Sequence, residues 1–153
     1  YGDGEMLSSV SSNITPTYFK EGSSYPDVSW VQAGEWNEVV DLMDTGSIDE
    51  WESSDYSVSS RSFWLRVVGD SMTASTGASI PEGHLILVDP DAVPENGSLV
   101  IAKLIDSGEA TFKKLVIDAG KSYLKPLNPS YRTIEINGNC KIVGVVREAK
   151  VKF

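Results

Sequence analysis

The residues with the clearest chemical potential are one serine and two neighbouring lysines. Ser71 follows an apolar run, residues 63–68, that stops at Gly69-Asp70, so we predict a strand that delivers this serine into a tight turn. Such a turn can present a hydroxyl nucleophile and leave neighbouring backbone N–H groups facing a developing oxyanion. The Gly-x-Ser-x-Gly motif is absent, and a strand followed by an ordinary loop is the alternative interpretation.

Lys113 and Lys114 lie in a strand-like run, residues 109–117. Side chains alternate along a strand, so one of the two lysines must point inward. Burial lowers the pKa of a lysine, and a neutral amine can accept the proton of a serine hydroxyl. The pattern therefore permits a Ser-Lys dyad, although the Ser-x-x-Lys spacing is missing. His84 is the only histidine and the alternative base; it lies beside a turn, where an exposed histidine is unremarkable.

A possible substrate lies within the chain itself. Residues 28–36 hold Ala33 and Gly34 between two tryptophans, and we predict a short extended segment there. Small side chains on extended backbone are what a protease cleft accepts, while a strand ending in a glycine turn is the alternative. Residues 1–27 read as a linker or partly ordered arm. Residues 37–60 are acidic and serine-rich, without metal-ligand spacing, and read as a solvated loop.

The elements that position these residues are predicted to be strands. Short apolar or alternating runs are separated by turn signals such as Pro81-Glu82-Gly83 and Asn137-Gly138, with no long helical period and no internal repeat. This pattern is typical of an all-β domain, here spanning residues 28–153. The expected strands include residues 85–88, a hairpin of 98–105 and 109–117, and residues 122–127, 131–136 and 140–146.

Composition excludes several classes of protein. The 153 residues suit one core, and a net charge of −9 makes the chain a poor partner for phosphate backbones. The single cysteine, Cys140, allows no internal disulfide, and no metal site or cofactor is indicated. No membrane span or signal peptide is seen, so a cytoplasmic location is expected.

Five motifs follow one another along the chain: Trp30-Val31-Gln32-Ala33-Gly34, Phe63-Trp64-Leu65 with Gly69-Asp70-Ser71-Met72-Thr73, Leu85-Ile86-Leu87-Val88-Asp89-Pro90, Thr111-Phe112-Lys113-Lys114-Leu115, and Leu127-Asn128-Pro129 through Val143-Gly144. In this order and at this spacing they resemble the C-terminal domain of lambdoid phage repressors, within the LexA-like self-cleaving repressors and UmuD-type proteins. The resemblance runs from about residue 25 to about residue 147.

The resemblance implies a LexA-like domain of mostly antiparallel strands with a mobile cleavage-site segment. By position, Ser71 becomes the nucleophile and Lys113 the general base, with Lys114 facing solvent. Ala33-Gly34 matches the scissile bond. The backbone N–H groups of Asp70 and Ser71 are the candidates for the oxyanion hole.

The resemblance also implies a function for the whole protein. It would be a repressor that forms a homodimer or tetramer and is inactivated by self-cleavage on SOS induction, through a RecA filament or an antirepressor. Operator DNA would be bound only by an N-terminal helix-turn-helix domain that this chain lacks. Residues 131–136 and 142–146 are candidates for the dimer edge.

Three alternatives remain open. The domain could be a non-cleaving oligomerisation module, in which Ser71 and Lys113 persist without useful chemistry. It could instead be a UmuD-like polymerase accessory protein, which has no DNA-binding domain. A type I signal peptidase shares the dyad but needs a membrane anchor, which is missing here.

Overall fold

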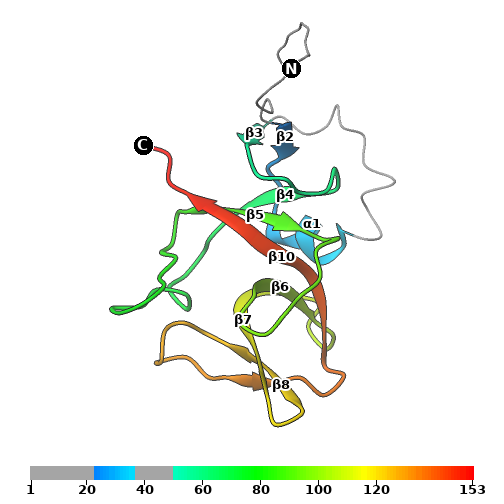
Figure 1. The fold of residues 1–153 in the computed structure, drawn as a ribbon, viewed down its shortest axis with the longest axis vertical. Helices are drawn as coiled ribbons and strands as arrows, with labels where there is room; N and C mark the ends of the chain where they lie inside the picture. Colours follow the sequence, from blue (N-terminus) through cyan, green and yellow to red (C-terminus); the bar gives the residue numbers. More distant parts are fainter. Residues whose placement is uncertain (1–22, 37–49) are drawn as a thin grey trace, which may run out of the picture.

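The structure is a computed structural model that describes residues 23–36 and 50–153. Within these ranges nearly all of the regular secondary structure is strand, which confirms the predicted all-β class (Figure 1). The elements are β2 (Ser23–Pro26), α1 (Trp30–Gly34), β3 (Trp51–Ser54), β4 (Phe63–Arg66), β5 (Leu85–Asp89), β6 (Leu99–Leu104), β7 (Ala110–Asp118), β8 (Lys121–Lys125), β9 (Ile134–Glu135) and β10 (Cys140–Lys150).

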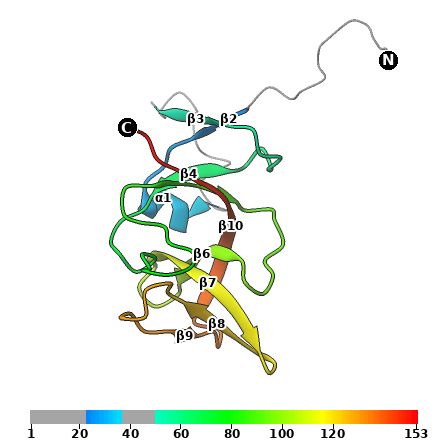
Figure 2. The same cartoon turned by 60° about the vertical axis from the view of Figure 1, so that its left-hand side comes forward.

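The main sheet has the strand order β4-β5-β10-β6-β7-β8-β9, and every neighbouring pair is antiparallel. The sheet curls into a half-barrel along which β10 runs (Figure 2). The predicted hairpin is confirmed as β6 and β7. At Gly144 a Cβ atom would lie 2.7 Å from Val88 Cγ1, so β10 can approach β5 this closely only with a glycine.

Both faces of the sheet are covered, which explains why β5 is a continuous apolar run and buried throughout. Side chains alternate between separate clusters: Ile86 and Val88 join one, while Leu85 and Leu87 join another. The largest cluster contains Val28, Ala33, Trp36, Phe63, Leu65, Val67, Met72, Ile86, Val88, Ile101, Phe112 and Val143. The domain therefore has its principal core between the sheet and α1.

A second, two-stranded sheet pairs β2 with β3 in antiparallel register, from Ser23 opposite Ser54 to Pro26 opposite Trp51. The prediction of a solvated loop was wrong for residues 51–54, because long-range pairing overrides their polar composition. Two contacts hold β3 in place: Trp64 Nε1 donates to Glu52 O at 3.0 Å, and Ser54 donates to Glu148 at 2.5 Å. Residues 1–22 of the predicted arm and residues 37–49 of the predicted loop lie outside the described residues.

The prediction of an extended segment at residues 28–36 was also wrong, because Trp30–Gly34 form helix α1. Ser29 caps this helix: its hydroxyl accepts from Gln32 N at 3.1 Å, while Gln32 Oε1 accepts from Ser29 N at 2.8 Å. This reciprocal pair is a capping box. The small residues that suggested a cleavable strand instead permit close packing, since a Cβ on Gly34 would lie 3.3 Å from Gly108 O.

The remaining strands differ from prediction in length. Of residues 131–136 only Ile134–Glu135 form a strand, whereas the last strand continues past residue 146 to Lys150. Its end lies beside the smaller sheet, where Lys150 Nζ donates to Ser53 O at 2.9 Å (Figures 1 and 2). No helix in the two described ranges is long and apolar enough to cross a membrane.

Candidate active site

Ser71 lies in the turn that follows β4, as predicted. One residue past the end of β4, Val67 N donates to His84 O at 2.8 Å, and two residues further on Gly69 has a φ of +81°. Such a φ strains any residue with a Cβ, so glycine is required where the chain reverses. Glu82 Oε2 accepts from Gly69 N at 3.0 Å. The turn therefore has a defined conformation immediately before the serine.

Lys113 approaches this turn from β7. It is the inward lysine of the pair, at 8% exposed, whereas Lys114 is partly exposed. Its Nζ lies 3.5 Å from Ser71 Oγ, 2.8 Å from Thr111 Oγ1 and 3.1 Å from the Phe112 carbonyl oxygen. Residues 42 positions apart in sequence thus meet at one point.

The surroundings of Lys113 favour a neutral amine. Burial lowers the pKa of Lys113 because desolvation penalises the charged form. A neutral amine has two N–H donors and one lone pair; the oxygens of Thr111 and Phe112 can take the two donors, leaving the lone pair for the Ser71 hydroxyl. The 3.5 Å separation must shorten for proton transfer, as is common before substrate binds.

A cleft of about 330 Å³ opens beside the serine, lined by Trp30, Val67, Val68, Ser71, Met72, Ala110, Thr111 and Phe112. Its walls are mostly apolar, so a substrate that fills it would displace water from the serine and lysine. Ala33 and Gly34 do not line this cleft. Ala33 is 0% exposed within α1, so the structure joins Ser71 to Lys113 without placing the predicted scissile bond between them.

The N–H groups of Asp70 and Ser71 are available as donors. Among the hydrogen bonds of the described residues, neither group donates, whereas both carbonyls accept. Asp70 O accepts from Thr73 N and from Asn128 Nδ2, each at 3.0 Å, and Ser71 O accepts from Asn128 N at 3.0 Å. The assignment of the two amides to an oxyanion hole stays a prediction.

Three contact residues of this site were missed from the sequence: Thr111, Asn128 and Tyr131. Thr111 could have been found, because residues two apart in a strand share a face and Thr111 precedes Lys113 by two. Asn128 and Tyr131 lie in the loop after β8, and nothing in the sequence around them predicts their contacts with the turn that holds Ser71. His84 shows backbone hydrogen bonds only in the described part of the chain.

Two tryptophans fasten α1 to the body of the domain. Trp30 Nε1 donates to Arg66 O at 2.8 Å, and Trp36 Nε1 donates to Arg61 O at 2.7 Å. Trp36 is 2% exposed, and its ring lies 4.5 Å from that of Phe63 between centroids. Trp36 therefore belongs to the core, while Trp30 is only half-buried and faces the cleft.

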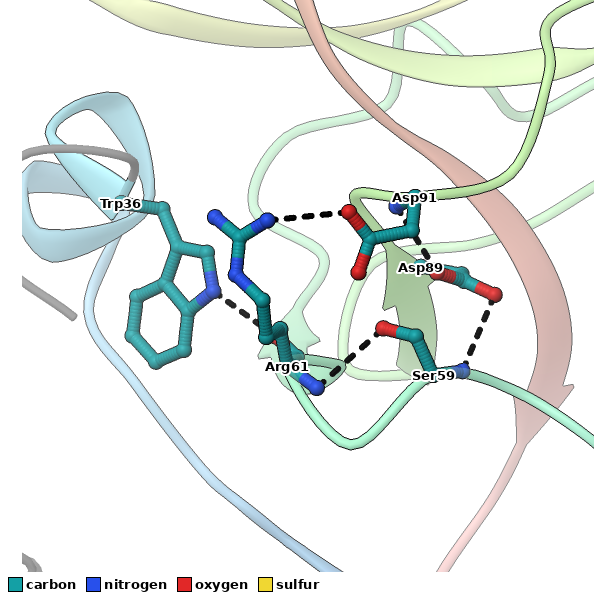
Figure 3. A network of polar contacts seen from close by, with 5 residues as sticks. All are labelled: Trp36, Ser59, Arg61, Asp89 and Asp91. Atoms are coloured by element: carbon teal, nitrogen blue, oxygen red, sulfur yellow. Dashed lines mark hydrogen bonds and ion pairs between the residues drawn. The ribbon is translucent and has the colours of Figure 1, made fainter. Parts of the chain in front are cut away.

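The support behind Trp36 continues into a polar network (Figure 3). Arg61 Nη1 contacts Asp91 Oδ1 at 2.9 Å, Ser59 N donates to Asp89 Oδ2 at 3.2 Å, and Asp91 N donates to Asp89 Oδ1 at 2.9 Å. Asp89 is the buried last residue of β5, so the loop that accepts the Trp36 indole is tied to the main sheet. In the described ranges, no group of three or more His, Cys, Asp or Glu residues could hold a metal ion.

Comparison with known proteins gives a consistent result. Residues 26–147 match the family model described as Peptidase S24-like. Repressor protein C2 of Salmonella phage P22 is 59% identical over 128 residues, covering 84% of this chain and 59% of that protein. The HTH-type transcriptional regulator for conjugative element R391 of Providencia rettgeri is 47% identical over 153 residues, covering 99% and 70%. LexA repressor 2 of Geobacter sulfurreducens is 38% identical over 132 residues, covering 81% and 60%.

The chain is thus similar over most of its length to repressors and transcriptional regulators. It spans 59% of the length of the phage P22 repressor and 60% of the Geobacter protein, so it corresponds to part of those proteins.

Proposed function

Since this chain belongs to the peptidase S24-like family, we propose that it is the C-terminal domain of a phage or prophage repressor that cuts itself between Ala33 and Gly34. Ser71 is the nucleophile and Lys113 the general base. The observation that carries the proposal is the buried Lys113 amine, which lies 3.5 Å from Ser71 Oγ.

The reaction follows from this geometry. Neutral Lys113 takes the proton from Ser71 as Oγ attacks the carbonyl carbon of Ala33, and the N–H groups of Asp70 and Ser71 stabilise the oxyanion. The ammonium of Lys113 then gives its proton to the nitrogen of Gly34, and the C–N bond breaks. Lys113 next deprotonates a water molecule, which attacks the ester between Ala33 and Ser71; the bond from the carbonyl carbon to Ser71 Oγ breaks, and Lys113 returns the proton to Oγ. The products are a carboxylate on Ala33 and a new amino terminus on Gly34.

Self-cleavage requires α1 to rearrange, because Ala33 is fully buried in the helix. The segment must leave its packing site, become extended and enter the cleft that Trp30 now lines. Its covalent attachment gives it a high effective concentration there, so a minor population of the docked form supports slow cleavage. An inducer that binds the docked form raises that population. A RecA filament or an antirepressor would act in this way.

In the whole repressor, this domain would supply a homodimer or tetramer, and an N-terminal helix-turn-helix domain outside this chain would bind the operator in the host cytoplasm. The charge of −9 agrees with a domain that does not itself bind phosphates. The relatives named above are repressors and regulators, which favours this hypothesis over a polymerase accessory protein.

A second candidate function is a non-cleaving oligomerisation module. The burial of Ala33 and Gly34 in α1 favours it, because the helix withholds the bond from Ser71. The two candidates differ in one property: the self-cleaving domain must reach a second conformation, whereas the module need not.

The test is to incubate the purified chain at alkaline pH over a hundredfold range of protein concentration and to measure intact masses. The proposal predicts two fragments, residues 1–33 and 34–153, with a rate constant independent of concentration because the substrate is intramolecular. A rate that rises with concentration, or a cut at another bond, contradicts it. A Ser71→Ala chain measures the contribution of any contaminating protease.

A further inference from the structure

The loop that follows β8 makes three contacts with the turn that carries Ser71. Asn128 N donates to Ser71 O at 3.0 Å, and Asn128 Nδ2 donates to Asp70 O at 3.0 Å. The hydroxyl of Tyr131 donates to Asp70 Oδ1. One short loop thus binds the backbone of both residues and the side chain of the first.

The loop has internal hydrogen bonds that fix these donors. Tyr131 N donates to Asn128 O at 3.1 Å, and Ser130 N donates to Asn128 Oδ1 at 3.0 Å. The second bond also sets the orientation of the Asn128 amide, with its Nδ2 toward the turn. Tyr131 remains 46% exposed, so burial of its ring in the core does not explain its contact with Asp70.

These contacts determine where one candidate oxyanion donor, the Ser71 N–H, points. A peptide unit is planar and its C=O and N–H lie on opposite sides. The Asp70 carbonyl and the Ser71 N–H belong to one such unit, so the bond from Asn128 Nδ2 to Asp70 O fixes the direction of the Ser71 N–H. In the same way, the bond from Asn128 N to Ser71 O fixes the direction of the Met72 N–H.

Tyr131 contacts the side chain of Asp70 and not the backbone of the turn. Asp70 places a carboxylate directly before the nucleophile, and a negative charge near the developing oxyanion opposes its formation. The hydroxyl of Tyr131 holds Asp70 Oδ1, which limits how far the carboxylate can turn toward the reacting atoms.

We propose that Asn128 and Tyr131 are positioning residues for self-cleavage: Asn128 fixes the direction of the Ser71 amide donor, and Tyr131 restrains the Asp70 carboxylate. The proposal rests on the proposed function, since the orientation matters catalytically only if Ser71 attacks a peptide bond. Neither residue takes part in proton transfer.

The first experiment compares self-cleavage rates at one alkaline pH. Tyr131→Phe and Asn128→Asp each lower the rate about tenfold, the size expected for one lost hydrogen bond, with a melting temperature within about two degrees of the parent. Tyr123→Phe, which removes a hydroxyl on β8, is the matched control and leaves the rate within about twofold. In an Asp70→Asn background, Tyr131→Phe has a smaller effect, because the carboxylate is gone. Equal effects in both backgrounds would overturn the role assigned to Tyr131.

The second experiment does not depend on cleavage. In a Ser71→Ala chain, hydrogen exchange at the Thr73 amide, which donates to Asp70 O within this turn, is compared with and without Asn128→Asp or Tyr131→Phe. The proposal predicts exchange at least about fivefold faster in each variant, since a restraining hydrogen bond is lost. Unchanged exchange overturns the proposal even if cleavage is observed. Absence of fragments from the wild-type chain instead overturns the proposed function, while the exchange data still decide whether the loop fixes the turn.

Discussion

At Lys113, three oxygen atoms surround one buried amine, and each has a distinct part in the account. In the proposed reaction Ser71 gives up its proton, while Thr111 and the Phe112 carbonyl, which lie 2.8 and 3.1 Å from the amine, orient the group that receives it. A lysine side chain has four rotatable carbon–carbon bonds and would otherwise sample many positions. The hydroxyl of Thr111 is thus expected to matter for the reaction although it exchanges no proton with substrate.

Replacing Thr111 tests that expectation. Thr111→Val keeps the shape of the side chain but removes the hydroxyl, so we expect self-cleavage to slow about tenfold, the effect of one lost hydrogen bond. Thr111→Ser keeps the hydroxyl and should stay within about threefold of the parent. The rates are measured from intact masses over time. Equal rates in the Val and Ser variants would show that the hydroxyl does not position the amine.

The lowered pKa of Lys113 also predicts how stability depends on pH. Burial places the folded pKa below the unfolded value of about 10.4. Between the two values the unfolded chain binds a proton that the folded chain does not, so the free energy of unfolding contributed by this group rises with pH through that window. At lower pH both states are protonated and the burial penalty is present in full.

Denaturant unfolding of two chains in a Ser71→Ala background measures this effect. We compare Lys113→Met with its Lys113 parent at about pH 7 and about pH 10, where the Met side chain does not titrate. The free energy of unfolding of the Lys113 parent should rise relative to that of Lys113→Met as the pH rises. Lys114→Met, on the partly exposed neighbour, is the matched control and should show a smaller change. If the free energy of unfolding of the Lys113 parent instead fell relative to that of Lys113→Met, the claim that burial lowers the pKa of Lys113 would be contradicted.

Local signals made Ser71 and one of the two lysines candidates, and the family resemblance then selected Ser71 and Lys113. An apolar run ending in Gly69 predicts a turn at Ser71, and strand alternation predicts that only one of two adjacent lysines is buried. Tyr131 and Asn128 could not be predicted in the same way. Their contacts with Asp70 and Ser71 join segments about 60 positions apart, and only the folded chain brings these segments together.

At the scale of elements, α1 would control access to the proposed reaction, because it buries Ala33. The helix is only five residues long, too short to be stable alone, so its cap and its two anchoring tryptophans maintain it. The prediction of an extended segment failed although the spacing Ser29-x-x-Gln32 is itself a capping-box signal. Small residues at positions 33 and 34 are compatible with a cleavable strand and with a tightly packed helix, and packing against β7 selects the helix here.

Weakening the cap should therefore speed self-cleavage. Ser29→Ala removes the hydroxyl that accepts from Gln32 N, and loss of such a cap costs about 1 kcal/mol. If the helix is the inactive form, its population relative to the docked form falls and the rate rises about fivefold. Ser24→Ala, an exposed serine of β2, is the control and should not change the rate. A slower rate in Ser29→Ala would mean that the capped helix assists cleavage.

At the scale of the whole molecule, the segments before and after Ala33-Gly34 are held together by non-covalent contacts as well as by the peptide bond. Upstream of it, β2 pairs along its length with β3, Asp27 N donates to Glu50 O, and Val28 N donates to Trp64 O, both at 3.0 Å. Tyr25 is 5% exposed in a cluster with Trp64. These contacts do not involve the scissile bond, so they survive its cleavage.

The two fragments should therefore remain associated after the cut. Native mass spectrometry of the cleaved chain is expected to show the complex of residues 1–33 with 34–153, which separates in denaturant. Tyr25→Ala should weaken the complex about a hundredfold, because it removes a large buried side chain. Fragments that separate under native conditions without that substitution would show that β2 depends on the intact chain for its place.

The arrangement of the sheets was only partly predictable at this scale. Residues 85–88 could be predicted as a strand because both faces are buried and the run is therefore apolar throughout. The β6–β7 hairpin could be predicted because it pairs segments that are neighbours in the sequence. The β2–β3 sheet is formed by polar segments whose pairing depends on Tyr25, Trp64 and the end of β10. Neither composition nor periodicity predicts that these two segments pair. The non-covalent link across the proposed scissile bond depends on this sheet, so it could not be predicted from the sequence either.

The most direct measurement is the pH dependence of self-cleavage in three chains: wild type, Ser71→Ala and Lys113→Ala. Each is incubated at about pH 7 and about pH 10 and followed by intact mass. The account predicts faster production of residues 1–33 and 34–153 by the wild type at the higher pH, because Lys113 loses its proton, and no fragments from either variant. Fragments from Lys113→Ala at the wild-type rate, or a wild-type chain that stays whole at high pH with its core folded, would contradict the Ser-Lys mechanism.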